Sequence, residues 1–456
     1  MMFHDLPRYG AYTPAGDWLA EVPAGWSWKP ARTIFSERKE PGFVDEQMLS
    51  VTIGRGVIRQ ADLLSSTAKK DSSNLDKSKY KLVEPGDVVY NKMRAWQGAA
   101  GGSAYRGIVS PAYIVMTPRS DLTDYFHHIV RTPMFAKEAE RWSYGITSDQ
   151  WSLRPEHFKM IRFPVPPADE QAAIVKYLSH ANARIDKAIT AKRRLIALLE
   201  EQIRTQADVA ISDLPTGTAE PLLGRALRRI EQGMSPTAVE GDLAKNQWAV
   251  LSLSAVNRGT FVADALKPVD PDLAVPAGLE LRDGDLLMTR SNTRDRVGDV
   301  AVVSGVRPRT FMSDLIYRLV PLEDFLSPEY ASVLLRTRRV RSQIESSARG
   351  SSDTMPKLAQ AHIKGLRVPV PTLDVQRGVV DALARQAKPI LMAADRAGCE
   401  VSLLQEFRRR LVADVVTGQV DVRAIAATLP AAPEAVADLA ADSDDELEEV
   451  AEDCDD

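Results

Sequence analysis

The sequence predicts an α+β protein with an internal pseudo-two-fold repeat: two mixed, strand-rich globular domains separated by two long helices that form an antiparallel coiled coil. The main observation is a duplication, because residues 163–171 (FPVPPADEQ) return 205 positions later as residues 368–376 (VPVPTLDVQ). A long stretch of helical periodicity follows each segment, and Leu178 and Leu383 keep the same offset without a gap. A duplication of this size indicates two similar modules in one chain.

Composition is compatible with more than one hydrophobic core. The chain has 456 residues, of which 44% are hydrophobic and 26% charged, and single cores stop growing near ~250 to 300 residues. No stretch approaches the ~18 apolar residues of a membrane span, and the first residues lack the apolar core of a signal peptide. Two cysteines, Cys399 and Cys454, provide neither a disulfide framework nor a zinc set. We therefore expect a cytoplasmic protein.

The formal net charge of −4 averages two different regions. Residues 434–456 contain 12 acidic residues and no Lys or Arg, so the remaining chain carries a net charge of +8. Such a tail cannot bury enough apolar surface to become ordered. One interpretation is a solubilising disordered end, and the other is a segment that competes within the molecule with a polyanion for the basic surface.

Turn residues and apolar runs divide the chain into five segments. Short apolar runs between turns such as Pro41-Gly42 indicate strand-rich domains, and Asp169 after Pro166-Pro167 is a plausible N-cap of the first long helix. The predicted organisation is a first strand-rich domain (1–168), a first spacer helix (169–211), a second strand-rich domain (212–372), a second spacer helix (373–416) and a C-terminal segment with the acidic tail (417–456).

Both helices carry residues at alternating spacings of four and three, which is the heptad seam of a coiled coil. The predicted packing residues are Leu178, Ile185, Ile189, Ile196 and Leu199 in the first helix and Leu383, Ile390, Val401 and Leu404 in the second. A connection as long as a whole domain leaves room for an antiparallel arrangement. About 40 helical residues would span roughly 60 Å, enough to hold two domains well apart.

Three residues depart from the heptad pattern. Asn182 and Lys192 lie on the seam, where they either fix the register at a cost in stability or reach solvent as the helix turns. Pro389 lacks a backbone donor, which predicts a kink or a helix break near Ala387.

Basic residues concentrate in the two mixed domains, each time after an apolar, strand-like run. Arg, Lys, Asn and Gln can bind phosphates and the edges of bases, although a solvated basic surface is the alternative. The predicted DNA-contacting residues are Lys92, Arg94, Trp96, Gln97, Ser148 and Gln150 in the first domain and Arg290, Asn292, Arg294, Arg296, Arg349 and Ser351 in the second.

Motifs of catalysis are absent from the sequence. It contains no Walker A loop, no GxGxxG, no amino-methyltransferase motif of the Asn/Asp-Pro-Pro-Tyr/Phe type and no convincing nuclease carboxylate set. The adjacent His127 and His128 would diverge on a helix or strand and so are interpreted as packing or surface residues. We expect no catalytic residue and no metal site.

Several segments together resemble the specificity (S) subunits of type I restriction-modification systems. They are residues 164–167 (PVPP) followed by Glu170-Gln171, residues 415–421 (VVTGQVD), and residues 86–98 (GDVVYNKMRAWQG) with 107–113 (GIVSPAY), which are similar to a common variety of target recognition domain. The resemblance covers about residues 15 to 423. Val375 in place of the usual Glu, and Pro389, are departures from the pattern.

The resemblance implies a division of labour. Each recognition domain would read one half of a split double-stranded DNA site, and the antiparallel helices would set the unread gap and bind two modification (methyltransferase) subunits. This chain would carry no cofactor, because S-adenosylmethionine, ATP and magnesium are expected on partner subunits, which include restriction (translocase and endonuclease) subunits in some systems. Two other hypotheses remain open: a coiled-coil adaptor without DNA specificity, and a stand-alone DNA-modifying enzyme.

Overall fold

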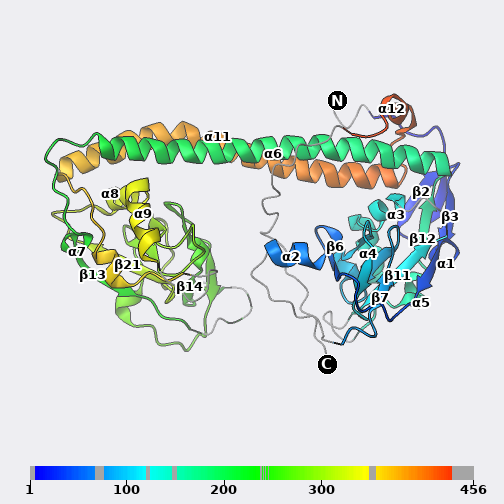
Figure 1. The fold of residues 1–456 in the computed structure, drawn as a ribbon, viewed down its shortest axis with the longest axis horizontal. Helices are drawn as coiled ribbons and strands as arrows, with labels where there is room; N and C mark the ends of the chain where they lie inside the picture. The colour runs from blue at the N-terminus through cyan, green and yellow to red at the C-terminus, as the bar shows by residue number, and fades with distance from the viewer. Residues whose placement is uncertain are drawn as a thin grey trace. The chain divides into compact units, whose positions relative to one another are not determined.

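The computed structural model contains two compact units, formed by residues 1–192 with 399–456 and by residues 193–398 (Figure 1). Each unit holds one mixed domain and parts of both long helices, so the predicted domain boundaries stay a prediction. The residues that the structure describes are 6–66, 76–119, 124–145, 151–236, 239, 241, 243–244, 246–348 and 356–433. The acidic residues 434–456 lie outside this part of the chain.

The first domain is a set of short antiparallel strands with small helices on its flanks. Its strands are β1 (Tyr12–Gly16), β2 (Leu19–Pro23), β3 (Ser27–Pro30), β4 (Phe35–Arg38), β5 (Leu49–Thr52), β6 (Gly56–Arg59), β7 (Lys81–Val83), β8 (Val88–Asn91), β9 (Ala100–Gly102), β10 (Gly107–Val109), β11 (Tyr113–Pro118) and β12 (Arg162–Val165). Its helices are α1 (Ala31–Ile34), α2 (Gln60–Ser66), the 3-10 helix η2 (Ala95–Gln97), α3 (Asp124–Ile129), α4 (Pro133–Arg141) and α5 (Pro155–Phe158).

The second domain repeats this plan with different connections. Its strands are β13 (Leu227–Gln232), β14 (Ala249–Leu251), β15 (Val256–Asn257), β16 (Thr260–Phe261), β17 (Leu266–Pro268), β18 (Leu286–Thr289), β19 (Val300–Val302), β20 (Thr310–Phe311) and β21 (Ile316–Pro321). Its helices are α7 (Leu223–Ala226), η4 (Leu253–Ala255), η5 (Ala277–Leu279), α8 (Pro328–Leu335), α9 (Arg338–Ser347) and α10 (Gln360–Lys364).

One four-stranded antiparallel sheet recurs in both domains. Its order is β4-β11-β8-β9 in the first domain and β13-β21-β18-β19 in the second. β11 and β21 hold the same place in their sheets. Val115 of β11 pairs with both β4 and β8, and Arg318 of β21 pairs with both β13 and β18. Asp87 and Asp285, which precede β8 and β18, each accept hydrogen bonds from an arginine, at 2.9 Å from Arg38 and 3.0 Å from Arg318. The duplication seen in the sequence is therefore a duplication of sheet topology.

A buried tyrosine joins each domain to the start of its long helix. The hydroxyl of Tyr125 lies 3.0 Å from the carbonyl oxygen of Pro164 and 2.8 Å from that of Val416, to which its one proton can be donated, and the hydroxyl of Tyr330 donates to the carbonyl of Pro369 at 3.1 Å. Both rings are fully enclosed in their cores. Because the two tyrosines and the two prolines keep the sequence offset of 205, the anchor belongs to the repeat itself.

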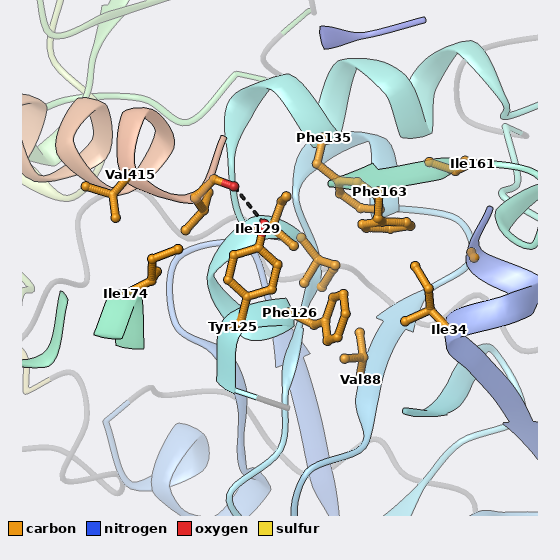
Figure 2. Packing of buried hydrophobic residues seen from close by; sticks show 14 of the residues in the cluster. Ile34, Val88, Tyr125, Phe126, Ile129, Phe135, Ile161, Phe163, Ile174 and Val415 are labelled. Atoms are coloured by element: carbon orange, nitrogen blue, oxygen red, sulfur yellow. Dashed lines mark hydrogen bonds between the residues drawn. The ribbon is translucent and has the colours of Figure 1, made fainter. Parts of the chain in front are cut away.

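The core of the first unit gathers residues from the domain and from both long helices. Figure 2 shows Tyr125, Phe126 and Phe163 of the domain beside Ile174 of one helix and Val415 of the other. Burial of large apolar side chains stabilises by about 1.5 to 3 kcal/mol each relative to exposure. This shared core fixes the first domain to the helices in its own unit.

The two long helices are α6 (Ala168–Ser212) and α11 (Leu373–Val416). In the first unit they pack antiparallel, because Asp186 of α6 pairs with Arg408 of α11 at 2.6 Å while the later Lys192 pairs with the earlier Glu400 at 2.5 Å. All nine predicted packing residues of the two helices, and the seam residues Asn182 and Lys192, are buried or half-buried.

The seam departures have different outcomes. Lys192 reaches the edge of the helix pair and forms its ion pair with Glu400 there. Asn182 stays half-buried, and its side-chain oxygen has no hydrogen-bond partner among the described residues. The expectation of a helix break at Pro389 is wrong, because α11 continues through it from residue 373 to residue 416. Pro389 is exposed while Ile390 is buried, so the solvent-facing side of the helix accommodates the ring.

The presence of Val375 in place of the usual glutamate also has a structural reason. Glu170, its counterpart, is buried and accepts hydrogen bonds from the Tyr9 hydroxyl and, at 2.9 Å, from the Trp26 indole nitrogen. Tyr9 and Trp26 both precede the four-stranded sheet of the first domain, so the carboxylate of Glu170 serves a contact made in the first unit. Within the described residues, no helix is both long and apolar enough to cross a membrane.

Removing either anchoring hydroxyl should destabilise its own unit. Tyr125→Phe removes the hydroxyl shared by the Pro164 and Val416 carbonyls, and Tyr330→Phe removes the donor to the Pro369 carbonyl. Each change should lower the free energy of unfolding by about 1 to 3 kcal/mol. Urea unfolding checks this, with Tyr177→Phe as the control because no hydrogen bond to that half-buried hydroxyl occurs among the described residues. Equal unfolding midpoints for all three variants would contradict the anchor.

Candidate nucleic-acid interface

The first candidate loop, residues 92–98, leaves the end of β8 and is held by its own backbone. The Lys92 amide donates to the carbonyl of Ala112 at 3.1 Å, and the Asn91 side chain accepts from the Met93 amide at 2.9 Å. The loop closes through η2 and Gly98, whose φ of 96° is the left-handed conformation that glycine adopts without strain. Polar side chains on this loop are therefore presented from a fixed backbone.

The second candidate loop leaves β18 in the same way. Its Arg290 amide donates to the carbonyl of Leu315 at 2.7 Å. The carbonyls of Lys92 and Arg290 accept from the amides of Leu153 and Leu358, in both cases at 2.8 Å. Residues 92–97 and 290–296 of the two predicted sets thus lie on structurally equivalent loops, one in each domain.

Side chains of the first loop divide into presented and structural groups. Lys92, Arg94 and Gln97 are half-exposed, and only a long 3.4 Å hydrogen bond links Arg94 to Gln97. Trp96 is engaged inside the domain, because its indole nitrogen donates to the Met93 carbonyl at 2.9 Å and its ring packs against Trp151. The first three can face a ligand, whereas Trp96 supports the loop.

The second loop shows a similar division. Arg290 has a side-chain exposure of 28% because its guanidinium donates to the Asp314 carbonyl at 3.3 Å and lies over the Tyr317 ring. Arg294 is exposed, and no salt bridge to it occurs among the described residues. Asn292 and Arg296 are half-exposed. Arg294 is the clearest candidate for a nucleic-acid contact in this domain.

An acidic residue limits the positive charge of the second loop. Burial opposes ionisation of Asp295, but the hydrogen bond from Thr293 and the charges of Arg258 and Arg296 outweigh it and hold the pKa of this carboxyl below its ordinary value. Asp295 therefore stays anionic at neutral pH. The loop therefore carries charges of both signs, with Asp295 between Arg294 and Arg296.

Four predicted contact residues, Ser148, Gln150, Arg349 and Ser351, lie outside the described residues. Sequence reasoning also missed two exposed basic residues close to the loops. Lys357 forms a β-bridge with Ser291 next to Arg290, and Arg154 directly follows Leu153, whose amide binds the first loop. The signal that could have found them is the shared offset, which aligns residues 152–154 with 357–359.

The adjacent histidines lie on α3 and pack inside the first domain. The ring of His127 lies 3.1 Å from the Gly102 amide and edge-on to the ring of His128. Burial first, and then the positive charge of Arg131, lower the pKa of His127; burial, His127 and Arg131 lower that of His128 to about 3. Both rings are neutral at neutral pH. Among the described residues, no three His, Cys, Asp or Glu side chains are grouped to hold a metal ion.

A repeated mixed domain and a pair of long antiparallel helices form the architecture that the resemblance to type I specificity subunits implies. The specificity subunit of the type I restriction enzyme EcoEI from Escherichia coli is 24% identical over 172 residues, which are 38% of this chain and 29% of that protein. No family model matches the chain.

Solved structures give the same comparison for the fold. A chain from a structure on complex assembly and conformational transition of the type I restriction-modification system has 16% identity and a TM-score of 0.54, covering 88% of this chain and 99% of its own. The HsdS subunit from Thermoanaerobacter tengcongensis has 16% identity and a TM-score of 0.38, covering 88% and 98%. The chain shares the fold of the first structure, and the resemblance to type I specificity subunits is confirmed.

Two arginine substitutions should separate support from contact in the second loop. Arg290→Ala removes a guanidinium packed on Tyr317 and bonded to Asp314, so the free energy of unfolding should fall by about 1 kcal/mol. Arg294→Ala, on the exposed part of the loop, should change it by less than about 0.5 kcal/mol. Denaturant unfolding measures both. A loss at Arg294 as large as that at Arg290 would show that Arg294 is structural.

Proposed function

We propose that this chain is the DNA sequence-recognition subunit of a type I restriction-modification complex and has no catalytic activity of its own. One observation carries the proposal: the two domains share a sheet order and an anchoring tyrosine, yet their equivalent loops carry different polar side chains. Two domains with the same fold but different loop side chains fit a protein that recognises two different half-sites. The sequence match spans only 29% of the curated relative, so substrates and partners are part of this proposal.

Each loop would read bases while its surroundings bind the DNA backbone. Arg94 and Gln97 would read the half-site of the first domain, with Lys92 of the same loop on the DNA backbone beside it, and Asn292 and Arg294 would read the half-site of the second. Arg and Lys donate to guanine, and Asn and Gln pair with adenine, each good bidentate contact contributing about 1 to 3 kcal/mol of discrimination. Exposed lysines such as Lys357 would contribute the phosphate contacts that every sequence offers.

The helix pair would set the unread gap between the half-sites. α6 is 45 residues long and α11 is 44, so at 1.5 Å per residue each is about 65 to 70 Å long. Their seam buries apolar residues in alternating spacings, which makes the pair a stiff element. A stiff helix pair of this length would hold the two domains at a fixed separation, which recognition of two half-sites with a fixed gap requires.

Two modification subunits would bind the helices and supply adenine methylation. Leu198 of α6 and Leu403 of α11 occupy equivalent positions of the repeat, and they are 59% and 68% exposed. Two equivalent exposed leucines suit two copies of one partner, in line with the pseudo-two-fold repeat. S-adenosylmethionine would bind to those subunits, and ATP and magnesium to restriction subunits where these are present.

Exchange of one domain tests the proposal. Replacing residues 15–165 with the same segment of another specificity subunit should change one half of the methylated motif and leave the other half and the gap intact. Methylome sequencing of cells that express the chain with its modification partner gives the readout. The matched control is Arg294→Ala, which should relax only the half read by the second domain. A motif in which both halves change, or neither, would refute modular reading.

A further inference from the structure

The first domain contains a hollow beside the 92–98 loop that the contacts described so far leave unused. Its volume is about 500 Å³, which is within the range of small-molecule sites. The residues that line it and matter for its chemistry are Lys92, Met93, Tyr144, Ser152, Arg154 and Glu156. All of them belong to the first unit.

Tyr144 gives this hollow an exposed aromatic wall. Tyr144 is 57% exposed and is among the exposed large hydrophobic residues of the described part of the chain. The ring is nevertheless fixed, because it packs edge-on against His157 with 4.8 Å between ring centroids, and the Tyr144 and Ser152 backbones bond to each other at 3.2 and 3.4 Å. An exposed but immobilised ring can stack on a flat partner at little further entropic cost.

Charged side chains surround this ring. Lys92 and Arg154 line the hollow, and no ion pair to either occurs among the described residues. Two cations without a carboxylate partner favour a ligand that carries negative charge close to its flat part. Glu156, which also lines the hollow, can accept a hydrogen bond from an exocyclic amine.

The corresponding place in the second domain has different contents. Backbone pairing of the two loops matches Pro111 and Ile114, which line the hollow, with Asp314 and Tyr317. In the second domain the Arg290 side chain lies over Tyr317 and bonds to the Asp314 carbonyl. Arg290 thus covers the place in the second domain that corresponds to the hollow. The second domain can therefore serve as a control for experiments on the hollow of the first.

We propose that the hollow receives one unstacked nucleobase of the bound duplex, stacked on Tyr144, with the adjacent phosphates held by Lys92 and Arg154. This inference rests on the proposed function, and it deepens that function by assigning base eversion to the first domain. Extruding a base costs a few kcal/mol, while stacking on an aromatic side chain returns about 1 to 3 kcal/mol per base. Two phosphate contacts supply the remainder.

A scan of mismatches tests this inference. The chain in complex with its modification subunits is titrated with the duplex target and with duplexes that carry one mismatch at each position of the first half-site. Because a mismatch removes part of the cost of extrusion, one position should bind about tenfold more tightly than the matched duplex. The methylated adenine is left out, since tightening there would come from the methyltransferase subunit. Affinities are measured at fixed salt.

Substitutions assign the effect to the hollow. Tyr144→Ala should abolish the gain at that position, and Tyr144→Phe should keep it because the ring remains. Arg154→Gln, at an exposed residue, should weaken binding of matched and mismatched duplexes alike. The same scan over the half-site of the second domain should give no tightening that depends on Tyr144.

The outcomes separate this inference from the proposed function. Selective binding of the matched target, with no mismatch gain or with a gain that persists in Tyr144→Ala, overturns the base-binding hollow and leaves DNA recognition standing. Absence of selective binding to any target overturns both. If Tyr144→Ala weakens assembly with the modification subunits but keeps the mismatch gain, the hollow is a protein contact and the inference is wrong.

Discussion

The structure depends on one repeated contact, the buried tyrosine hydroxyl that binds the proline carbonyl before each long helix. Tyr125 and Tyr330 make this bond at equivalent positions. A glutamine one turn into each helix repeats a second contact, since the Gln171 and Gln376 amides both donate to a proline carbonyl at 2.8 Å. Because unmade buried hydrogen bonds cost more than formed ones contribute, these contacts strongly favour a single orientation of each domain on its helix.

The two copies of the repeat differ at positions that take no part in the shared tyrosine–proline contact. Glu170 accepts hydrogen bonds from Tyr9 and Trp26 in the first unit. Val375, at the equivalent position of the second copy, has no carboxylate and cannot accept such bonds. On the two candidate loops, Lys92 borders a hollow, whereas Arg290 is bound to Asp314 and Tyr317. Loop side chains can therefore diverge without disturbing the fold, which is the property that a recognition protein with two independent half-sites requires.

Much of the fold could be predicted because its signals are local and repeated. The heptad spacing identified the buried face of α6 and α11, and the apolar, strand-like runs that precede Lys92 and Arg290 placed these two residues on equivalent loops. The helix break expected as one outcome at Pro389 does not occur, because α11 continues from residue 373 to residue 416 and the exposed side of the helix accommodates the ring. The structural role of Trp96 and the pinning of Arg290 could not be predicted, since both depend on contacts with residues distant in the sequence.

Matched insertions in the two helices test most directly whether the helix pair sets the gap. Four residues added after Ile189 and four after Leu404 extend the pair by about 6 Å and turn it by about 40°, and coiled coils accommodate such insertions by local unwinding. One base pair rotates DNA by about 35°, so the methylated motif should keep both half-sites and lengthen its gap by one base pair, or two at most. An active complex with an unchanged gap, or with altered half-site bases, would contradict the account.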